Sequence, residues 1–201
     1  MQSRLLRKII KRVPLNSSFW IAVLFFGQGI CSLAFTLSIK VPLESVIAAV
    51  AVLFAGGLVS LAIYLLNPSG PEGNRQWVIM ALFYALFIFL MSSRSYPNAD
   101  VHFDTSYLHP VEYLTLGLLL GRMWYSVIDS KGFLSFSIRV LLAGALFGAS
   151  DEIHQAFIPG RDCDFVDFLF DVGGTAAAIL LIALIRRVID LQVRINSEAL
   201  E

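Results

Sequence analysis

The chain has 201 residues, of which 57% are hydrophobic and only 15% are charged, and its mean hydropathy is +0.75. This composition excludes an ordinary soluble domain and is typical of a membrane protein. Fifteen basic residues balance fifteen acidic ones. We therefore expect membrane lipids as partners and no nucleic acid.

The apolar runs predict an all-α fold, a polytopic transmembrane helical bundle of about six helices. One crossing takes roughly 20 apolar residues, so a chain of this length has no room for a second folded domain. In chain order the predicted crossings are Phe19–Ile39, Leu43–Leu66, Trp77–Met91, Pro110–Ile128, Phe133–Ala149 and Phe165–Ile185. The third is only about 22 Å long at 1.5 Å per residue, so neighbouring residues must extend it or the bilayer must thin.

These runs divide the chain into four parts. They are a basic amphipathic cytoplasmic segment (1–16), two accessory transmembrane helices (17–66), a four-helix membrane domain (77–187) and a polar cytoplasmic tail (188–201). The first part places apolar residues on one helical face and basic residues opposite, which is typical of an interfacial helix on anionic lipid. A disordered basic leader is the alternative, and both interpretations keep this end in the cytoplasm.

The placement of basic residues predicts the orientation of the bundle. With both termini in the cytoplasm, every basic residue except Lys40, Arg94 and Arg161 lies on the cytoplasmic side or at a cytoplasmic helix end. This asymmetry is the one that cytoplasmic loops of membrane proteins show. The outer side then receives the loops Ser92–His109 and Ser150–Asp164, together with most of the acidic residues.

Small residues recur at helix-packing spacings in the last three predicted crossings. Gly117 and Gly121 form one pair, Gly144 and Gly148 form a second, and a run of glycine and alanine follows Gly173. Such residues let two helix backbones approach closely. The last three crossings are therefore expected to form the tightly packed core.

Ionisable residues gather in two segments beside the outer loops. Such groups are costly near hydrocarbon unless they are paired, hydrated or ligand-bound, so they are candidates for a functional site. In the first segment Pro110 suits the first turn of a helix, which places His109, Glu112 and Tyr113 on one face.

The second segment runs from Asp151 to Gly174. If the fifth helix continues past Ser150, then Asp151, Glu152 and Gln155 lie one turn apart, and Pro159 with Gly160 ends that helix. On the last helix the carboxylates recur at spacings of three and four and form one stripe; they are Asp164, Asp167 and Asp171. The loop acids have a simpler interpretation as solvated residues or helix caps. For the deeper acids, purely structural pairing with Arg94 or Arg161 is the alternative to a ligand role.

Both segments resemble the VanZ-like membrane proteins, over roughly Trp77 to Ile185. The first motif of that family is a His followed by a Glu and a Tyr at the start of a helix. This chain has a similar arrangement in His109, Glu112 and Tyr113, after a loop that contains Ser92, Ser93 and Pro97. The second is similar to Asp151, Glu152, Gln155, Phe157, Pro159, Gly160, Arg161, Asp167 and Gly174. Two features differ, since an Asp-Lys pair before the histidine is missing and Asp171 stands where many members have Asn.

The resemblance implies a role in the cell envelope. The family is named for a protein that confers low-level resistance to teicoplanin, a lipid-tailed glycopeptide. A multi-pass protein of the bacterial cytoplasmic membrane is therefore expected, with its site on the extracytoplasmic side. The predicted orientation agrees with this independently.

Three functions are compatible with the residues. In the first, an outward-facing polar site binds an amphipathic anionic ligand, such as a lipid-linked cell-wall precursor or a lipoglycopeptide, and the sequence names no certain cofactor for it. Its predicted ligand-binding residues are Arg94, His109, Glu112, Tyr113, Asp151, Glu152, Gln155, Arg161, Asp167 and Asp171.

The second function is a membrane-embedded enzyme that acts on a lipid phosphate with a divalent cation. Its candidate metal ligands are Glu112, Glu152, Asp167 and Asp171, and its candidate catalytic residues are His109, Glu112, Glu152 and Asp167. The third is an ion-coupled transporter, which the sequence disfavours because no acidic residue lies near the middle of a predicted crossing.

Overall fold

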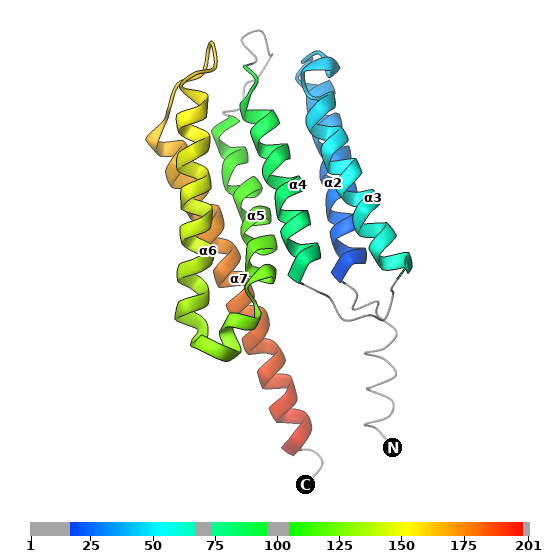
Figure 1. The fold of residues 1–201 in the computed structure, drawn as a ribbon, viewed down its shortest axis with the longest axis vertical. Coiled ribbons are helices and arrows are strands. Elements are labelled where there is room, and N and C mark those ends of the chain that lie inside the picture. Colours follow the sequence, from blue (N-terminus) through cyan, green and yellow to red (C-terminus); the bar gives the residue numbers. More distant parts are fainter. Residues whose placement is uncertain (1–16, 67–73, 96–104, 199–201) are drawn as a thin grey trace. The chain divides into compact units, whose positions relative to one another are not determined.

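The computed structural model describes residues 17–66, 74–95 and 105–198 (Figure 1). Every regular element in these ranges is helical, which confirms the all-α class. The α-helices are α2 (Ser17–Ser38), α3 (Ile47–Leu66), α4 (Asn74–Ser92), α5 (His109–Met123), α6 (Ser126–Gln155) and α7 (Phe165–Glu198). Two short 3-10 helices, η1 (Leu43–Ser45) and η2 (Thr105–Leu108), precede α3 and α5. The predicted segment 1–16 lies outside the described residues.

Five of these helices are long and apolar enough to cross a membrane, namely α2, α3, α4, α6 and α7. The short third crossing is extended at both ends, because α4 has 19 residues and is therefore about 28 Å long. The fourth predicted crossing corresponds to α5, which has only 15 residues. The orientation of the helices in the membrane stays a prediction.

The predicted end of the fourth crossing, at Ile128, is wrong. Helix α5 stops at Met123, and residues from Ser126 onward already belong to α6. The predicted link Asp129–Gly132 is helical up to Gly132, where φ 84° and ψ 164° interrupt α6. That backbone conformation is one that glycine adopts readily. The turn that ends α5, at Trp124 and Tyr125, lies inside an apolar run, so hydropathy could not locate it.

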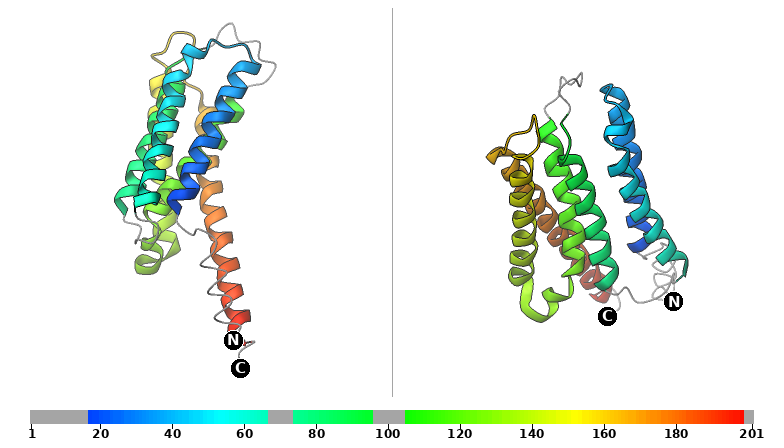
Figure 2. Two further views of the ribbon diagram at one scale, coloured as in Figure 1. Left: turned by 90° about the vertical axis from the view of Figure 1, so that its right-hand side faces the viewer. Right: turned by 45° about the horizontal axis from the view of Figure 1, so that its top comes forward.

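Helix α7 begins at Phe165 as predicted but continues to Glu198, far past Ile185. Figure 2 shows it extending beyond the ends of α5 and α6. Its last part is rich in residues that favour helix, such as arginine, leucine and glutamine, although it is too polar to read as a crossing. The segment predicted as a polar tail is therefore largely helical.

The chain divides into two compact units, one made of residues 1–91 and 98–100 and the other of residues 92–97 and 101–201. All but the last residue of α4 thus groups with α2 and α3, whereas the sequence grouped it with the later helices. In the first unit Gly56 lies against the ring of Phe25, and Gly57 lies against that of Phe26. Gln28 donates a hydrogen bond to the Tyr84 hydroxyl at 2.7 Å.

The second unit is built around α7, which packs against both α5 and α6. Small residues make these contacts close, as predicted. A methyl group added at Gly117 would lie 2.7 Å from the Ala178 side chain, and one at Gly144 would collide with Thr175. Gly117 on α5 and Gly144 on α6 therefore face the same turn of α7.

Candidate functional site

The candidate site lies at one end of the second unit. Helix α5 begins there, α6 ends there and α7 begins there (Figure 1). The turn between α6 and α7 contains Pro159 and Gly160, and Gly160 has a φ of 80°. This left-handed conformation suits glycine and reverses the chain. Residues far apart in the sequence therefore meet at this end, as the two motifs predicted.

His109, the first residue of α5, faces two carboxylates of α7. Its Nδ1 makes a hydrogen bond of 2.9 Å with Asp171 Oδ1, and its Nε2 lies 3.8 Å from Asp167 Oδ2. Asp167 and Asp171 are four residues apart, so they lie on one face of α7. The imidazole is buried, and the Asp171 side chain is completely buried. This face of α7 is therefore the carboxylate stripe that the sequence predicted.

Two further acids come from the last turn of α6. Asp151 Oδ2 accepts hydrogen bonds from the Ser92 hydroxyl at 2.9 Å and from Gln155 Nε2 at 3.2 Å. Glu152 Oε1 accepts a second bond from Gln155 Nε2, and Glu152 Oε2 accepts one from the Asp164 backbone amide at 2.8 Å. The helix continues past Ser150, as predicted, and this extension positions both acids.

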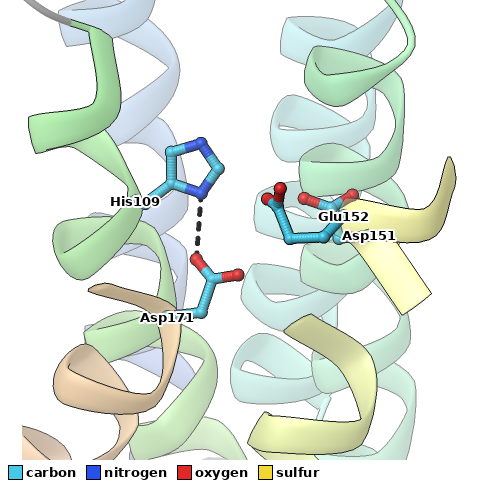
Figure 3. A group of neighbouring side chains, drawn as sticks. All are labelled: His109, Asp151, Glu152 and Asp171. Carbon is cyan, nitrogen blue, oxygen red and sulfur yellow. Dashed lines mark hydrogen bonds and ion pairs between the residues drawn. The ribbon is translucent and has the colours of Figure 1, made fainter. Parts of the chain in front are cut away.

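The acids of α6 face the His109–Asp171 pair across a short space (Figure 3). One potential ligand atom from each of His109, Asp151, Glu152 and Asp171 lies within 4.8 Å of the others, and all four residues are buried. We call these four residues the acidic cluster. Its members come from three helices, so only the folded unit assembles it.

An arginine adjoins the acidic cluster through a single amide side chain. Arg161 Nη1 donates to Gln155 Oε1 at 3.2 Å, while Arg161 Nε donates to the backbone carbonyl of Arg94 at 3.0 Å. Gln155 is almost completely buried. Within the described ranges Arg161 forms no ion pair with a carboxylate, because Gln155 lies between them.

Several buried polar atoms at this end have no hydrogen-bond partner among the described residues. They are the hydroxyl of Tyr113 and the carboxylate oxygens Asp151 Oδ1, Asp167 Oδ1 and Asp171 Oδ2. The Tyr113 hydroxyl is close enough to the charges of Asp151, Glu152 and Asp171 to interact with them electrostatically. Leaving a buried polar group unpaired costs about 1–3 kcal/mol. Four such groups in one place indicate that something else satisfies them.

The charges of the site are unbalanced. Four carboxylates face one imidazole here, and the nearest guanidinium contacts an amide instead of an acid. Buried charges need a counter-charge or protons. The site can therefore accept a cation among its acids, and Arg161 can bind an anion at its edge.

The structure brings together most of the predicted site residues, but not all. Glu112 is half-buried on α5 and is not part of the acidic cluster. Arg94 contributes its backbone carbonyl, while its side chain is exposed. Asp164 caps α7 by accepting a hydrogen bond from the Val166 amide at 2.7 Å, which is the simpler role considered for it. Pro97, from the loop before the first motif, lies outside the described ranges.

Sequence reasoning missed two serine contacts and one histidine. Ser92 was considered only as part of the loop before the first motif, yet it donates directly to Asp151. Ser93 lies 3.0 Å from His154 Nε2, and His154 had not been considered at all. The signal was the Ser-Ser pair at the end of an apolar run, but its partners lie about sixty residues away in the chain.

Long apolar helices together with a buried polar site at the end of a helical unit define a multi-pass membrane protein. Residues 52–186 match the VanZ/LLP1 family, and because this match covers most of the chain, the protein belongs to that family. The matched region begins within α3, earlier than the resemblance starting at Trp77. No curated protein and no solved structure matches the chain.

Proposed function

We propose that this VanZ-family membrane protein acts in the bacterial cell envelope by binding the anionic head of an amphipathic molecule. The ligand class is a lipid-linked cell-wall precursor or a lipoglycopeptide such as teicoplanin. Binding it at the outer face of the cytoplasmic membrane would contribute to glycopeptide resistance. Support for the envelope comes from family membership, and support for the outer face comes from the charge asymmetry of the sequence.

The observation that carries this proposal is the fixed guanidinium of Arg161. Two of its nitrogens are held by Gln155 Oε1 and the Arg94 carbonyl, which orients the planar group. Among the described residues it forms no direct ion pair with a carboxylate, although it is within electrostatic range of Glu112 and Asp151. A guanidinium presents its donors in a fork that matches phosphate and carboxylate oxygens. An oriented fork that has no direct ion pair, beside a buried polar cluster, favours an anionic head group.

An apolar surface surrounds the same end of the second unit. Large hydrophobic side chains are exposed on the last turns of α6, in the following turn and on the first turns of α7. They are Ile153, Phe157, Phe165, Val166 and Leu169. In a bilayer such side chains contact acyl chains, and equally the lipid tail of a bound ligand. A polar head site with an apolar rim suits an amphipathic molecule.

The test is direct binding of fluorescent teicoplanin, and of a lipid-linked precursor, to the full-length protein in nanodiscs. Arg161→Gln removes the guanidinium, and we expect it to weaken binding about tenfold or more. Arg186→Gln is the matched control, because Arg186 pairs with Asp129 at the opposite end of the unit and is not expected to change binding. Equal affinity of both variants and the parent would refute the proposed role of Arg161.

The same variants should be compared in cells. In a strain lacking the protein, expression of the parent chain should raise the minimal inhibitory concentration of teicoplanin. Arg161→Gln should not do so, although it should reach the membrane in equal amount. If neither the parent chain nor Arg161→Gln changes the resistance of the strain, the proposed role in resistance is rejected. The binding measured in nanodiscs would still stand.

The contact between His109 and Asp171 favours a second candidate, an enzyme that acts on a lipid phosphate. The Asp171 carboxylate is hydrogen-bonded to one ring nitrogen of His109, which orients the imidazole and stabilises its protonated form. An imidazole held in this way suits general acid-base catalysis. Phosphate release from a short-chain lipid phosphate would test this function, with His109→Gln as the inactive variant. Binding without turnover by the parent protein would leave only the first function.

A further inference from the structure

We propose that the acidic cluster binds one divalent cation, with His109, Asp151, Glu152 and Asp171 as its protein ligands. This inference deepens the proposed function, since it concerns the same site. It is nevertheless testable with the metal alone, so its failure is distinguishable from a failure to bind an amphipathic ligand. The ligand set retains Glu152 and Asp171 from the sequence prediction and adds His109 and Asp151.

The geometry allows one ion to contact all four side chains. Their potential ligand atoms all lie within 4.8 Å of one another. Nitrogen and oxygen ligands bind divalent cations at about 2.0–2.6 Å, so two ligands on opposite sides of an ion are about 4–5 Å apart. A single cation at the centre of the cluster is therefore within reach of each member. Small side-chain adjustments suffice for coordination.

The unpaired atoms of the site indicate where the cation would lie. Asp171 is completely buried, and its Oδ2 has no hydrogen-bond partner among the described residues. In Figure 3 that second oxygen points towards the side on which Asp151 and Glu152 lie. Asp151, which is 3% exposed, likewise has an unpaired oxygen, Oδ1. Carboxylate oxygens cannot satisfy one another, whereas a cation between them satisfies both.

An unpaired group from outside the cluster supports the same conclusion. The Tyr113 ring is completely buried and packs near Phe147, yet the Tyr113 hydroxyl has no partner in the described ranges. It lies within electrostatic range of Asp151, Glu152 and Asp171. A hydroxyl in this position suits a hydrogen bond to a water molecule on the metal.

The remaining atoms of the ligands are held as metal ligands usually are. Ser92 and Gln155 donate to Asp151 Oδ2, and the Asp164 amide donates to Glu152 Oε2. Such outer contacts orient ligands and are typical of metal sites. His109 Nδ1 is hydrogen-bonded to Asp171, a member of the cluster, while His109 Nε2 faces Asp167. A cation would take the place of the proton that His109 and Asp171 share.

The type of ligand restricts the choice of metal. Three carboxylates favour a hard cation, and one imidazole favours a transition metal. No thiol belongs to the cluster, and both cysteines of the chain are exposed. Mn²⁺ and Zn²⁺ fit this mixed set of nitrogen and oxygen ligands. Mn²⁺ is the more useful probe because the free ion gives a paramagnetic resonance signal.

The experiment is a Mn²⁺ titration of the full-length protein in nanodiscs after removal of metals with a chelator. Free Mn²⁺ is counted by electron paramagnetic resonance. We expect one saturable site per chain, with affinity lowered about tenfold or more by Asp151→Asn and by Asp171→Asn. Asp129→Asn is the matched control, because its side chain is 71% exposed and lies at the start of α6.

Absence of a saturable site in the parent protein would overturn the inference, as would equal loss of affinity in Asp129→Asn. Because the site variants could fold poorly, a second measurement uses the parent protein alone. Pulsed resonance spectra of bound Mn²⁺ should show coupling to an imidazole nitrogen, which His109→Gln should remove. Bound Mn²⁺ without this coupling would exclude the proposed ligand set.

Discussion

Gly174→Ala tests how the packing of α5 on α7 creates the candidate site. A methyl group at residue 174 would collide with the backbone carbonyl of Pro110 and lie 3.0 Å from the Leu114 nitrogen. Both atoms belong to the backbone of α5, so no side-chain rotation relieves the contact. Comfortable packing needs about 3.5–4.0 Å, so α5 must move away by on the order of 1 Å.

The size of the effect follows from two opposing terms. Overpacking a close-packed interface costs about 1–3 kcal/mol, while replacing glycine by alanine in a helix returns about 1 kcal/mol. We expect a net loss of up to about 2 kcal/mol in the free energy of unfolding. The displacement also carries His109, which adjoins Pro110, away from Asp171. Their 2.9 Å hydrogen bond would then lengthen beyond the range of a good bond.

Gly173→Ala is the matched control, because a methyl group added there meets no atom within 4 Å. Unfolding of both variants in mixed micelles gives the change in stability, and the Mn²⁺ titration gives the state of the site. Gly174→Ala should lose stability and Mn²⁺ affinity, while Gly173→Ala should be unchanged or slightly more stable. The reasoning is refuted if the two variants behave alike in both assays.

Two further predictions concern the candidate site. Ser92→Ala removes a buried donor to Asp151 and should lower the free energy of unfolding by about 1 kcal/mol. Ser130→Ala removes only an exposed local contact and should leave the free energy of unfolding unchanged. Unfolding of both variants in micelles measures the difference. Lowering the pH from about 8 to about 5 should weaken Mn²⁺ binding, because protons compete with the metal for carboxylates and imidazole. A Mn²⁺ affinity that stays constant over this range would contradict coordination by these groups.

The sequence predicted the all-α class because apolar length and helical spacing are local properties. The starts of α5 and α7 also follow from local signals, such as Pro110 in a first turn and Asp164 as a cap. The end of α5 did not, because the turn after Met123 is as apolar as the helix before it. Hydropathy identifies the segments that avoid water, but it does not change at a turn that lies inside an apolar segment.

The site was predictable in part for a related reason. Spacing determines which residues share a helix face, so Asp167 and Asp171 were correctly placed together. Spacing does not determine which neighbouring helix that face meets. Glu112, three residues from His109, is within electrostatic range of His109, Asp151 and Asp171 but is not one of the four residues of the acidic cluster. Likewise, the contribution of Arg94 is a backbone carbonyl, which no residue type reveals.

Gln155 explains why two acids and a guanidinium lie close together without a direct ion pair. Its amide nitrogen donates to Asp151 and Glu152, and its amide oxygen accepts from Arg161. The reverse orientation of the amide would place an acceptor against two carboxylates and a donor against a guanidinium, so both sides enforce the same orientation. Asp151 Oδ1 therefore stays available for the proposed cation, and Arg161 keeps its outer donors for the proposed anionic head group. One neutral side chain would thus separate the two proposed binding functions, which direct ion pairing would cancel.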